Sequence, residues 1–579
     1  MKACDFIIKY LSEKAGIDHI FTYAGGTNSM LLDSAHRLGR PRLIPCRHEQ
    51  NAALAADGYA KAKSGLGCAL AMSGPGATNM ITGIAQSFFD STPVFYLTGN
   101  VTTSTYKYDR PLRQFGYQET DIVSLVKPIT KQAYFVDKIQ RVSAALRSAL
   151  QQCTINRPGP VLYDIPFDIQ KLDVDESQLD VDFSLSVRTR LSKQQYVMFC
   201  ELLSAARKPL ILVGGGIQLS HAKKMLHDFS HRYNLPVVSS LLGRDAFDNT
   251  ESLYVGYIGS YGIRAANKIL AASDMVIVLG SRLDSRQTAN IQEFACNKKI
   301  IHIDIDPDVI GSTVEPALGI NMHLADFFED FQSFAKEKPL NYKTSGVWLT
   351  SINNVRKLLN EDAMQDFGAL NPKKFLRELS LAMPDGTTYT ADVGNNQMWT
   401  AQSFVLKAND RILYSGGLGT MGYAIPAAIG AYFACPDRPL VAVAGDGGFQ
   451  MSIAELQTIR EFNIPVKIVV LNNNMLGLMK NFQDENFNGQ YPATVIGYSV
   501  PDIEKIADAY GIQNYTLSVD QSGSEAINWL KSQTCPTLLQ VKVPNNWGPY
   551  PKVLPGSGLG KQYPPLADDV ESAIIKELL

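Results

Sequence analysis

Short apolar segments that end in glycine or polar residues recur along the chain, at spacings that leave room for a helix between them. The first series is GCALAM (67–72), PVFYLTG (93–99) and GPVLYDIP (159–166), and the second is KPLILVGGG (208–216), SDMVIVLGSR (273–282) and KIIHIDID (299–306). The third is TTYTADVG (387–394), RPLVAVAGDGG (438–448), PVKIVVLNNN (465–474) and PTLLQVKV (536–543). Such strands, alternating with helices, are typical of parallel sheets buried on both faces. We therefore expect an α/β protein with three consecutive doubly wound parallel-sheet domains.

Two polar stretches divide these series, one near 171–190 and the other near 335–370. A chain of 579 residues is also too long for one hydrophobic core, because single cores stop growing near about 250–300 residues. We predict an N-terminal domain at 1–175, a central domain at 190–340, a C-terminal domain at 365–550 and a tail at 551–579.

Composition and charge exclude several classes of protein. Hydrophobic residues make up 45% of the chain, but no apolar run reaches the roughly 18 residues of a membrane span. The first residues place Asp5, Lys9 and Glu13 among apolar ones, which predicts an amphipathic helix rather than a signal peptide, and hence a cytoplasmic protein. The eight cysteines show no metal-like spacing and are expected to be reduced thiols. A net charge of -2 without basic runs argues against a nucleic-acid partner.

Two polar clusters follow neighbouring strands of the third series. Gly445-Asp446-Gly447 ends one strand and Asn472-Asn473 ends the next, so both clusters emerge at the carboxyl edge of the sheet, where ligands bind. Gly445, Gly447 and Gly448 would let backbone amides approach a diphosphate closely. Mg²⁺ prefers oxygen ligands, which Asp446, Asn473 and a carbonyl near Met475 would supply. Alone, the GDG segment could equally be an ordinary strand-to-helix turn.

The pair of clusters resembles a known cofactor motif. GDG, 24 intervening residues and NN resembles the thiamine diphosphate motif of the family that includes pyruvate decarboxylase, pyruvate oxidase and acetohydroxyacid synthase. The resemblance implies thiamine diphosphate held through Mg²⁺, with Leu476 and Gly477 also at the cofactor.

Glu49 is the candidate for the activating acid. It lies in RHEQNAALAADGYA, which resembles the segment carrying the glutamate that, in this family, hydrogen-bonds the aminopyrimidine N1' and promotes loss of the C2 proton. The alternative is an acid at a helix N-terminus, which the helix dipole favours. Because Glu49 and Asp446 lie in different domains, the resemblance implies a site shared by two chains, in a homodimer or a homotetramer.

Further segments resemble acetohydroxyacid synthase catalytic subunits in order and spacing: YAGG (23–26), SGPGATN (73–79), QET (118–120), RPGP (157–160) and SGGLGTMG (415–422). The resemblance implies that Gln118 faces the substrate and that Met421 supports the bent cofactor. It places six more residues at the cofactor, of which the first two bound the mouth of the active site: Gly25, Gly26, Asn79, Asn395, Asn396 and Gly419.

The same resemblance makes the central domain a site for FAD. The residues implied are Arg157, Gly214, Gly215, Gly216, Gly280, Arg282, Arg286, Asp304 and Ile305. Glycines and arginines suit a nucleotide diphosphate. A vestigial nucleotide fold, with arginines in ordinary surface pairs, is the alternative.

The histidines indicate the fate of the intermediate. All eight precede residue 324 and none are adjacent, whereas simple decarboxylases of the family carry a His-His pair that delivers a proton. We therefore expect a carboligase that decarboxylates pyruvate or a similar 2-keto acid and transfers the acyl-anion unit to an acceptor carbonyl compound. A regulatory subunit is compatible with this prediction, but the sequence does not indicate one.

Four positions depart from the synthase pattern, and they leave alternatives open. Tyr117, Phe167 and Phe482 replace phenylalanine, lysine and tryptophan around the substrate, and Tyr261 replaces a histidine in the FAD region. The three changes around the substrate motivate a second hypothesis, in which the acceptor is a sugar or another ketone. An oxidoreductase resembling pyruvate oxidase and a noncatalytic assembly protein are further alternatives.

Overall fold

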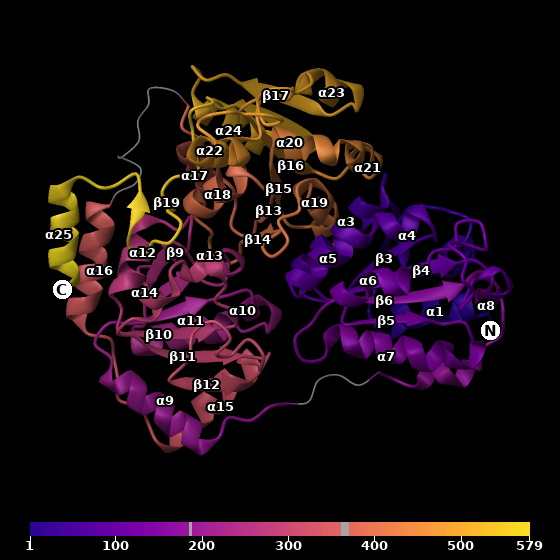
Figure 1. Ribbon diagram of the computed structural model, residues 1–579, viewed down its shortest axis with the longest axis horizontal. Helices are drawn as coiled ribbons and strands as arrows, with labels where there is room; N and C mark the ends of the chain where they lie inside the picture. The colour runs from indigo at the N-terminus through magenta and orange to yellow at the C-terminus, as the bar shows by residue number, and fades with distance from the viewer. Residues whose placement is uncertain (184–187, 360–369) are drawn as a thin grey trace.

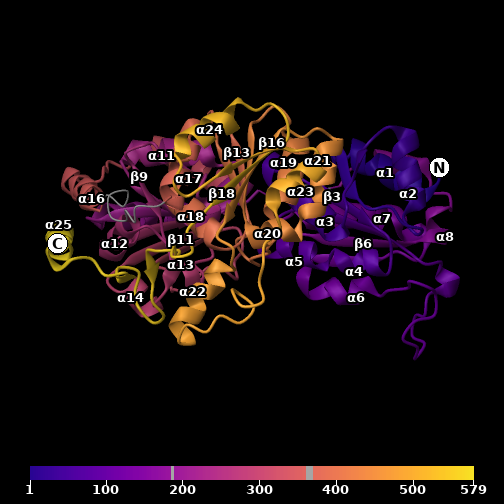
Figure 2. The same ribbon diagram turned by 90° about the horizontal axis from the view of Figure 1, so that it is seen from above.

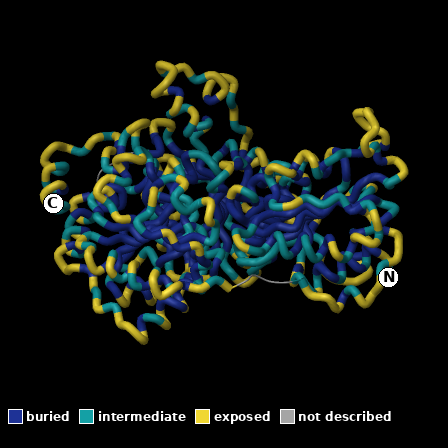
Figure 3. Tube along the Cα trace, turned by 60° about the horizontal axis from the view of Figure 1, so that its bottom comes forward, coloured by how far each residue is buried: buried dark blue, intermediate teal, exposed yellow. Residues whose placement is uncertain are grey.

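The computed structural model describes residues 1–183, 188–359 and 370–579, and these form three α/β units, each built around a six-stranded sheet whose strands all run parallel (Figure 1). The expected fold class is therefore confirmed. Figure 3 shows buried chain running through the centre of the molecule, with exposed chain in loops and outer helices.

The N-terminal sheet has the order β2-β1-β3-β4-β6-β5. Its strands are β1 (His19–Thr22), β2 (Arg42–Pro45), β3 (Gly67–Ala71), β4 (Val94–Asn100), β5 (Gln132–Phe135) and β6 (Val161–Pro166). The helices are α1 (Ala3–Glu13), α2 (Ser29–Leu38), α3 (Glu49–Lys63), α4 (Pro75–Asn79), α5 (Ile81–Phe89), α6 (Ile122–Val126), α7 (Val142–Thr154) and α8 (Phe167–Gln170). β2 and β3 lie on opposite sides of β1, so the switch point of the sheet lies between β1 and β3.

The central sheet has the order β12-β11-β10-β7-β8-β9. Its strands are β7 (Pro209–Val213), β8 (Val237–Ser239), β9 (Tyr254–Tyr257), β10 (Met275–Leu279), β11 (Lys299–Asp304) and β12 (Leu318–Asn321). The helices are α9 (Lys193–Ala205), α10 (Gly216–Leu219), α11 (Lys223–Tyr233), α12 (Arg264–Ala272), α13 (Ser285–Thr288), α14 (Ile291–Ala295), α15 (Leu324–Glu337) and α16 (Gly346–Leu358). Numbered from β7, this is the 3-2-1-4-5-6 order of dinucleotide-binding domains, with its switch point between β7 and β10.

The C-terminal sheet, β14-β13-β15-β16-β18-β17, repeats the order of the N-terminal one. Its strands are β13 (Thr388–Ala391), β14 (Arg411–Tyr414), β15 (Leu440–Gly445), β16 (Val466–Asn472), β17 (Gln513–Leu517) and β18 (Thr537–Lys542). The helices are α17 (Pro372–Ala382), α18 (Asn395–Ser403), α19 (Ala424–Ala434), α20 (Asp446–Met451), α21 (Leu456–Glu461), α22 (Gly477–Asn486), α23 (Ile503–Ala509) and α24 (Gly523–Ser532). The two outer domains therefore share a topology.

Helices α3 and α19 join the N-terminal and C-terminal domains through small residues. A Cβ added to Gly430 would lie 1.9 Å from the Ala55 carbonyl oxygen, and one added to Gly58 would lie 2.5 Å from Ala427. Further along α3, Lys61 donates to the Tyr423 hydroxyl (3.1 Å) beside the start of α19. The contacts run in opposite order along the two helices, so α3 and α19 pack antiparallel.

A buried ionic network lies at the Lys61 end of this helix pair. The Lys61 ammonium lies 2.8 Å from Asp57 and 2.7 Å from Asp90, and Asp90 also accepts from the amide of Gly417. Burial opposes the charge on Lys61, but the two carboxylates outweigh it and raise its pKa. We call Lys61, Asp57 and Asp90 the Lys61 network.

The last residues fold onto the central domain. Strands β19 (Lys552–Val553) and β20 (Gln562–Tyr563) pair antiparallel, and α25 (Asp568–Leu578) packs on α16 (Figure 1). Lys268 of α12 lies 2.6 Å from Glu571 of α25. The tail that we expected at 551–579 is thus ordered, and α16 lies inside the polar stretch at 335–370. Parts of the two polar stretches, 184–187 and 360–369, lie outside the described residues.

The cysteines and the apolar character of the helices bear on two expectations from the sequence. All eight cysteines are free thiols. Within 1–183, 188–359 and 370–579, no helix combines the length and apolar character needed to cross a bilayer.

Candidate active site

Three oxygen atoms converge at the carboxyl edge of the C-terminal sheet. The side-chain oxygen of Asn473, just after β16, lies 3.3 Å from Oδ2 of Asp446 and 2.9 Å from the carbonyl oxygen of Met475. In this orientation the amide oxygen faces only acceptors, which repel it unless a cation lies between them or the amide turns over to donate. Octahedral Mg²⁺ with ligands at 2.0–2.1 Å places neighbouring oxygens about 2.9 Å apart. The residues therefore fit a Mg²⁺ ion, and they are the three that the sequence predicted as ligands.

Asp446 is buried and held in place by hydrogen bonds. Only 2% of it is exposed; Oδ2 accepts from the amides of Asn473 (3.1 Å) and Asn474 (2.8 Å), and Oδ1 accepts from the Tyr498 hydroxyl (2.8 Å). Burial raises the pKa of this carboxyl, against the opposing effect of these hydrogen bonds. A divalent cation at Oδ2 would favour the ionised form. The arrangement holds a carboxylate in an orientation suited to binding a cation.

Glycines at this edge leave room that any side chain would fill. A Cβ at Gly447 would lie 2.7 Å from Leu476 and 3.2 Å from Met421, and one at Gly477 would lie 2.6 Å from the amide nitrogens of Asn395 and Asn473. The structure thus brings Leu476, Met421 and Gly447 into one cluster, as the sequence predicts. Gly445 also approaches Asn396, whose amide donates to the Asp392 carbonyl oxygen (2.6 Å). Gly419 lies in the left-handed region (φ 77°), two residues before Met421.

Asn395 carries an unsatisfied polar atom. Its side chain is buried, and among the described residues Oδ1 has no hydrogen-bond partner. A buried acceptor without a partner is costly, so a donor from a bound molecule would satisfy it. This supports the prediction that Asn395 contacts a cofactor.

Asp392 organises the edge from the neighbouring strand. It is fully buried, and its carboxylate accepts from the amides of Gly422 (2.9 Å) and Ala424 (3.0 Å), which holds the turn after Met421. A Cβ at Gly448 would lie 2.4 Å from Asp392 Oδ1, so this position requires glycine. Burial raises the pKa of Asp392 to about 6. β13 ends just before Asp392 and β15 ends beside Asp446, so the two acids flank the switch point between these strands.

The N-terminal domain carries a second cluster at its own switch point. Glu49, the first residue of α3, is 8% exposed, and its Oε2 accepts from the Asn79 amide (2.9 Å). A Cβ at Gly76 would lie 3.3 Å from Glu49 Oε1. The structure therefore joins Glu49 and Asn79, which the sequence predicted separately, around one carboxylate.

Gln118 lies beside this cluster in a strained conformation. Its φ is 64°, and Gly74 packs against it, since a Cβ there would lie 3.0 Å from Gln118 Cβ. The neighbouring Glu119 accepts from the amides of Lys107 (2.7 Å) and Phe115 (2.6 Å) and so fixes the loop that carries Gln118. Gly25 packs on Met72, whereas a Cβ at Gly26 would meet nothing within 4 Å.

The nine residues predicted for FAD line one cavity. It has a volume of about 560 Å³ and opens at the switch point between β7 and β10, where dinucleotides bind in such sheets. Gly214 and Gly216 follow β7, and Gly280 follows β10. Arg157 reaches the cavity from the N-terminal domain and donates a hydrogen bond to Asp306 of the central domain (3.1 Å). Tyr261 is not among the lining residues of the described chain; its carbonyl oxygen instead accepts from Gln402 (3.0 Å) of the C-terminal domain. The departure at Tyr261 therefore lies away from the cavity.

The sequence reasoning missed three residues that organise these clusters: Asp392, Tyr498 and Glu455. Glu455 is fully buried and accepts from the Arg47 amide (2.8 Å), tying the residues before Glu49 to the C-terminal domain. Asp392 had a signal, because it is an acid at the end of an apolar strand. Tyr498 and Glu455 had none, since their partners lie 52 and 408 residues away in sequence.

Comparisons with known proteins extend over all three domains. Residues 1–125, 198–331 and 392–541 match the N-terminal TPP binding domain, the central domain and the C-terminal TPP binding domain described for the thiamine pyrophosphate enzymes. A relative named acetolactate synthase, from Arthrospira platensis, is 35% identical over 555 residues, 93% of this chain and 94% of the relative. An acetolactate synthase large subunit from Haemophilus influenzae is 34% identical over 519 residues, 88% of this chain and 89% of the relative. A probable acetolactate synthase large subunit from Methanococcus aeolicus is 35% identical over 549 residues, 91% of this chain and 90% of the relative.

Proposed function

The chain belongs to the thiamine pyrophosphate enzyme family, and we propose that it is an acetolactate synthase-like carboligase, which decarboxylates pyruvate and joins the remaining two-carbon unit to an acceptor carbonyl compound. The observation that carries this proposal is the position of the Asn473 side-chain amide, which lies 3.3 Å from Asp446 Oδ2 and 2.9 Å from the Met475 carbonyl oxygen, so that the three residues surround one place for a cation. The match to acetolactate synthases over almost the whole chain supports the reaction class.

The C-terminal cluster would hold the cofactor. Asp446, Asn473 and the Met475 carbonyl would bind Mg²⁺, and the ion would neutralise the diphosphate. Met421 and Leu476, packed around Gly447, offer an apolar surface for the rings. When bound, thiamine pyrophosphate supplies a nucleophilic carbon that adds to a keto group and stabilises the negative charge left by departing CO₂.

The N-terminal cluster would control protons. Glu49 presents a nearly buried carboxylate whose orientation is fixed by Asn79, which suits an acid-base contact with the cofactor's aminopyrimidine ring. Gln118 would orient the acceptor. The C-terminal domain contains no histidine, so a common proton donor is missing there, and this favours transfer to a carbonyl acceptor over release of an aldehyde.

The separation of the two clusters along α3 supports a site built from two copies. Lys61 contacts Tyr423, two residues from Met421, whereas Glu49 lies twelve residues earlier on the same helix. At 1.5 Å per residue the separation is about 18 Å along α3. We therefore infer a homodimer, in which Glu49 of one copy faces Asp446 of the other.

Exposed apolar side chains support this arrangement. Tyr117, next to Gln118, is 86% exposed, and Met479 and Phe482, on the helix that begins at Gly477, are about half exposed. Figure 2 shows α22 and the loop after β4 projecting from the same side of the molecule. A second copy would cover both.

Mixing two inactive variants tests the shared site. Glu49→Gln and Asp446→Asn chains, each inactive alone, should regain about one quarter of wild-type activity when refolded or coexpressed together, since half of the dimers are mixed and each mixed dimer has one intact site. Absence of any regain would contradict a site built from two copies.

The central cavity would bind FAD, with glycines at the pyrophosphate and arginines as charge partners. Flavin absorbance of the purified protein, lost in an Arg282→Ala variant, would test this. Reduction of the flavin by pyruvate, with peroxide formation, would instead indicate a pyruvate oxidase-like enzyme.

Phe167 favours a second candidate acceptor, a sugar or another ketone without a carboxylate. Phe167 begins α8 at the carboxyl edge of the N-terminal sheet and presents an aromatic ring, with the Lys171 ammonium 4.1 Å from its centre. The ring itself offers no charge to an acceptor carboxylate. Incubation with pyruvate, Mg²⁺, thiamine pyrophosphate and either a 2-keto acid or a sugar ketone, with products identified by mass spectrometry, distinguishes the two acceptors. Failure to consume pyruvate under all conditions would refute the proposed function.

A further inference from the structure

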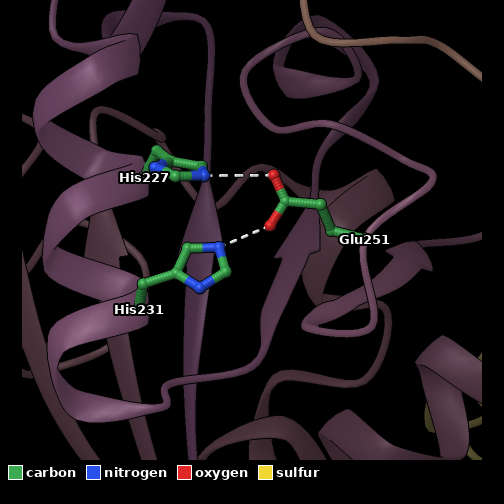
Figure 4. Close-up of side chains that lie close together, drawn as sticks. All are labelled: His227, His231 and Glu251. Atoms are coloured by element: carbon green, nitrogen blue, oxygen red, sulfur yellow. Dashed lines mark hydrogen bonds and ion pairs between the residues drawn. The ribbon is translucent and has the colours of Figure 1, made fainter.

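Two histidines and a glutamate form a cluster on the central domain, away from the residues discussed above. His227 and His231 lie one turn apart on α11 and point to the same side, toward Glu251 in the turn before β9 (Figure 4). The His227 Nε2 lies 3.2 Å from Glu251 Oε1, and the His231 Nε2 lies 2.5 Å from Glu251 Oε2. One ligand atom of each residue lies within 4.8 Å of the other two.

The surroundings fix the orientation of the two imidazoles. The ring of Phe247, which is buried, stacks with His231 at an interplanar angle of 14° and with His227 at 29°. Asp228 lies 3.4 Å from Nδ1 of His227, where it can accept the Nδ1 proton and leave Nε2 free to bind a metal. Glu251 is held by its own turn, since its carbonyl oxygen accepts from the Tyr254 amide (3.1 Å).

We propose that His227, His231 and Glu251 form a binding site for a divalent transition-metal ion of the Zn²⁺ type. Zn²⁺ accepts two imidazole nitrogens together with one carboxylate oxygen, whereas Mg²⁺ and Ca²⁺ prefer sites made of oxygen ligands alone. Tetrahedral Zn²⁺ with ligands at 2.0–2.2 Å separates them by about 3.3–3.6 Å, slightly more than the 3.2 Å between His227 Nε2 and Glu251 Oε1. The side chains of His231 and Glu251 are 44% and 23% exposed and have room to open by the further ångström needed. Water would complete the coordination.

The site would stabilise the junction between the central and C-terminal domains. Asn249, two residues before Glu251, exchanges hydrogen bonds with the backbone of Leu406, and Arg244 donates to the Phe404 carbonyl oxygen. An ion held between α11 and Glu251 would tie the loop that carries Asn249 and Glu251 to helix α11. The role is structural, so loss of the ion should leave the carboligase chemistry intact.

Zinc binding to the intact holoenzyme tests the proposal. The wild-type protein, saturated with Mg²⁺ and thiamine pyrophosphate, should bind one Zn²⁺ more per chain than His231→Ala, by dialysis and elemental analysis. Removing a ligand should weaken Zn²⁺ binding at this site at least about 100-fold. Asp228→Asn should weaken it about 10-fold, since the groups that hydrogen-bond metal-binding histidines are typically worth 10–100-fold in affinity. Zn²⁺ should also raise the melting temperature of the wild type and not that of His231→Ala.

Two further variants separate a metal site from a hydrogen-bonded cluster. His36→Ala removes an exposed histidine from the last turn of another helix, α2, and should bind Zn²⁺ as the wild type does. Glu251→Gln keeps a hydrogen-bonding side chain but removes the anionic ligand, so it should lose the extra Zn²⁺ while its metal-free melting temperature changes little. Equal Zn²⁺ stoichiometry and affinity in the wild type, His231→Ala and Glu251→Gln would overturn the proposal.

Discussion

Asp446→Asn should separate cofactor binding from folding. In the protein without cofactor, Asp446 Oδ2 accepts two backbone amides, and an asparagine oxygen can accept the same two. The amide nitrogen would then face the Tyr498 hydroxyl, which can turn to accept. Burying an amide costs less than burying a carboxylate, and burial already raises the pKa of Asp446. The cofactor-free variant should therefore melt at the wild-type temperature or slightly above it.

Cofactor binding should respond in the opposite direction. The substitution removes one negative charge and the only anionic ligand among the three converging oxygens. We expect affinity for thiamine pyrophosphate in saturating Mg²⁺ to fall at least about 100-fold, which corresponds to about 2.7 kcal/mol. The variant should also lose the rise in melting temperature that the cofactor produces in the wild type.

The measurements are isothermal titration with thiamine pyrophosphate and thermal melting with and without it. Tyr498→Phe is the matched control, because it removes one hydrogen bond to Asp446 and keeps the carboxylate; its affinity should fall about tenfold at most. If Asp446→Asn bound the cofactor normally, the metal assignment would be wrong. If it melted well below the wild type without cofactor, Asp446 would be a structural acid.

Three further predictions follow from the same clusters. Glu49→Gln should abolish carboligation, measured by product assays, and keep the affinity for thiamine pyrophosphate within about tenfold of the wild type, measured by titration. Normal turnover would exclude Glu49 as the activating acid. Mg²⁺-dependent cofactor binding should weaken as the pH falls through the pKa of Asp446, because protons compete with Mg²⁺ for the carboxylate. Burial raises this pKa above the value near 3.9 of an ordinary aspartate. An equal pH dependence of cofactor binding in Asp446→Asn would contradict this. Lys61→Met should destabilise the protein by about 3–5 kcal/mol, seen as a lower melting temperature, since two carboxylates stay buried without their cation. The control Lys63→Met should lower the free energy of unfolding by at most about 1 kcal/mol, because the Asp18 carboxylate that pairs with Lys63 is exposed.

The architecture was predictable because its signals are local. Apolar strands ending in glycine identify parallel sheets, and the carboxyl edge of such a sheet collects the residues that follow each strand. The sequence alone therefore predicts that Asp446 and Asn473 lie close together. The same reasoning places Gly214 and Gly280 on either side of one switch point, and both line the central cavity.

Residues that act from a distance were not predictable in this way. Tyr498 comes from a loop after α22 and reaches Asp446 only through the folding of the C-terminal domain. The polar stretch at 335–370 has a linker-like composition, yet α16 forms within it, capped by Ser345 and packed against α25 from the far end of the chain. In both cases the contacting partner is remote in sequence, so a local pattern does not predict the contact.

The packing of α3 on α19 has the largest consequence for function. Gly58 and Gly430 allow the two helices to touch along their length, and the antiparallel direction puts the Lys61 end of α3, not the Glu49 end, beside Met421. With the observed direction, Glu49 lies about 18 Å along α3 from Lys61, the residue that contacts Tyr423 near Met421. The helix direction therefore supports the homodimer that the resemblance implies, and the regain of activity by mixed Glu49→Gln and Asp446→Asn chains is its direct measure.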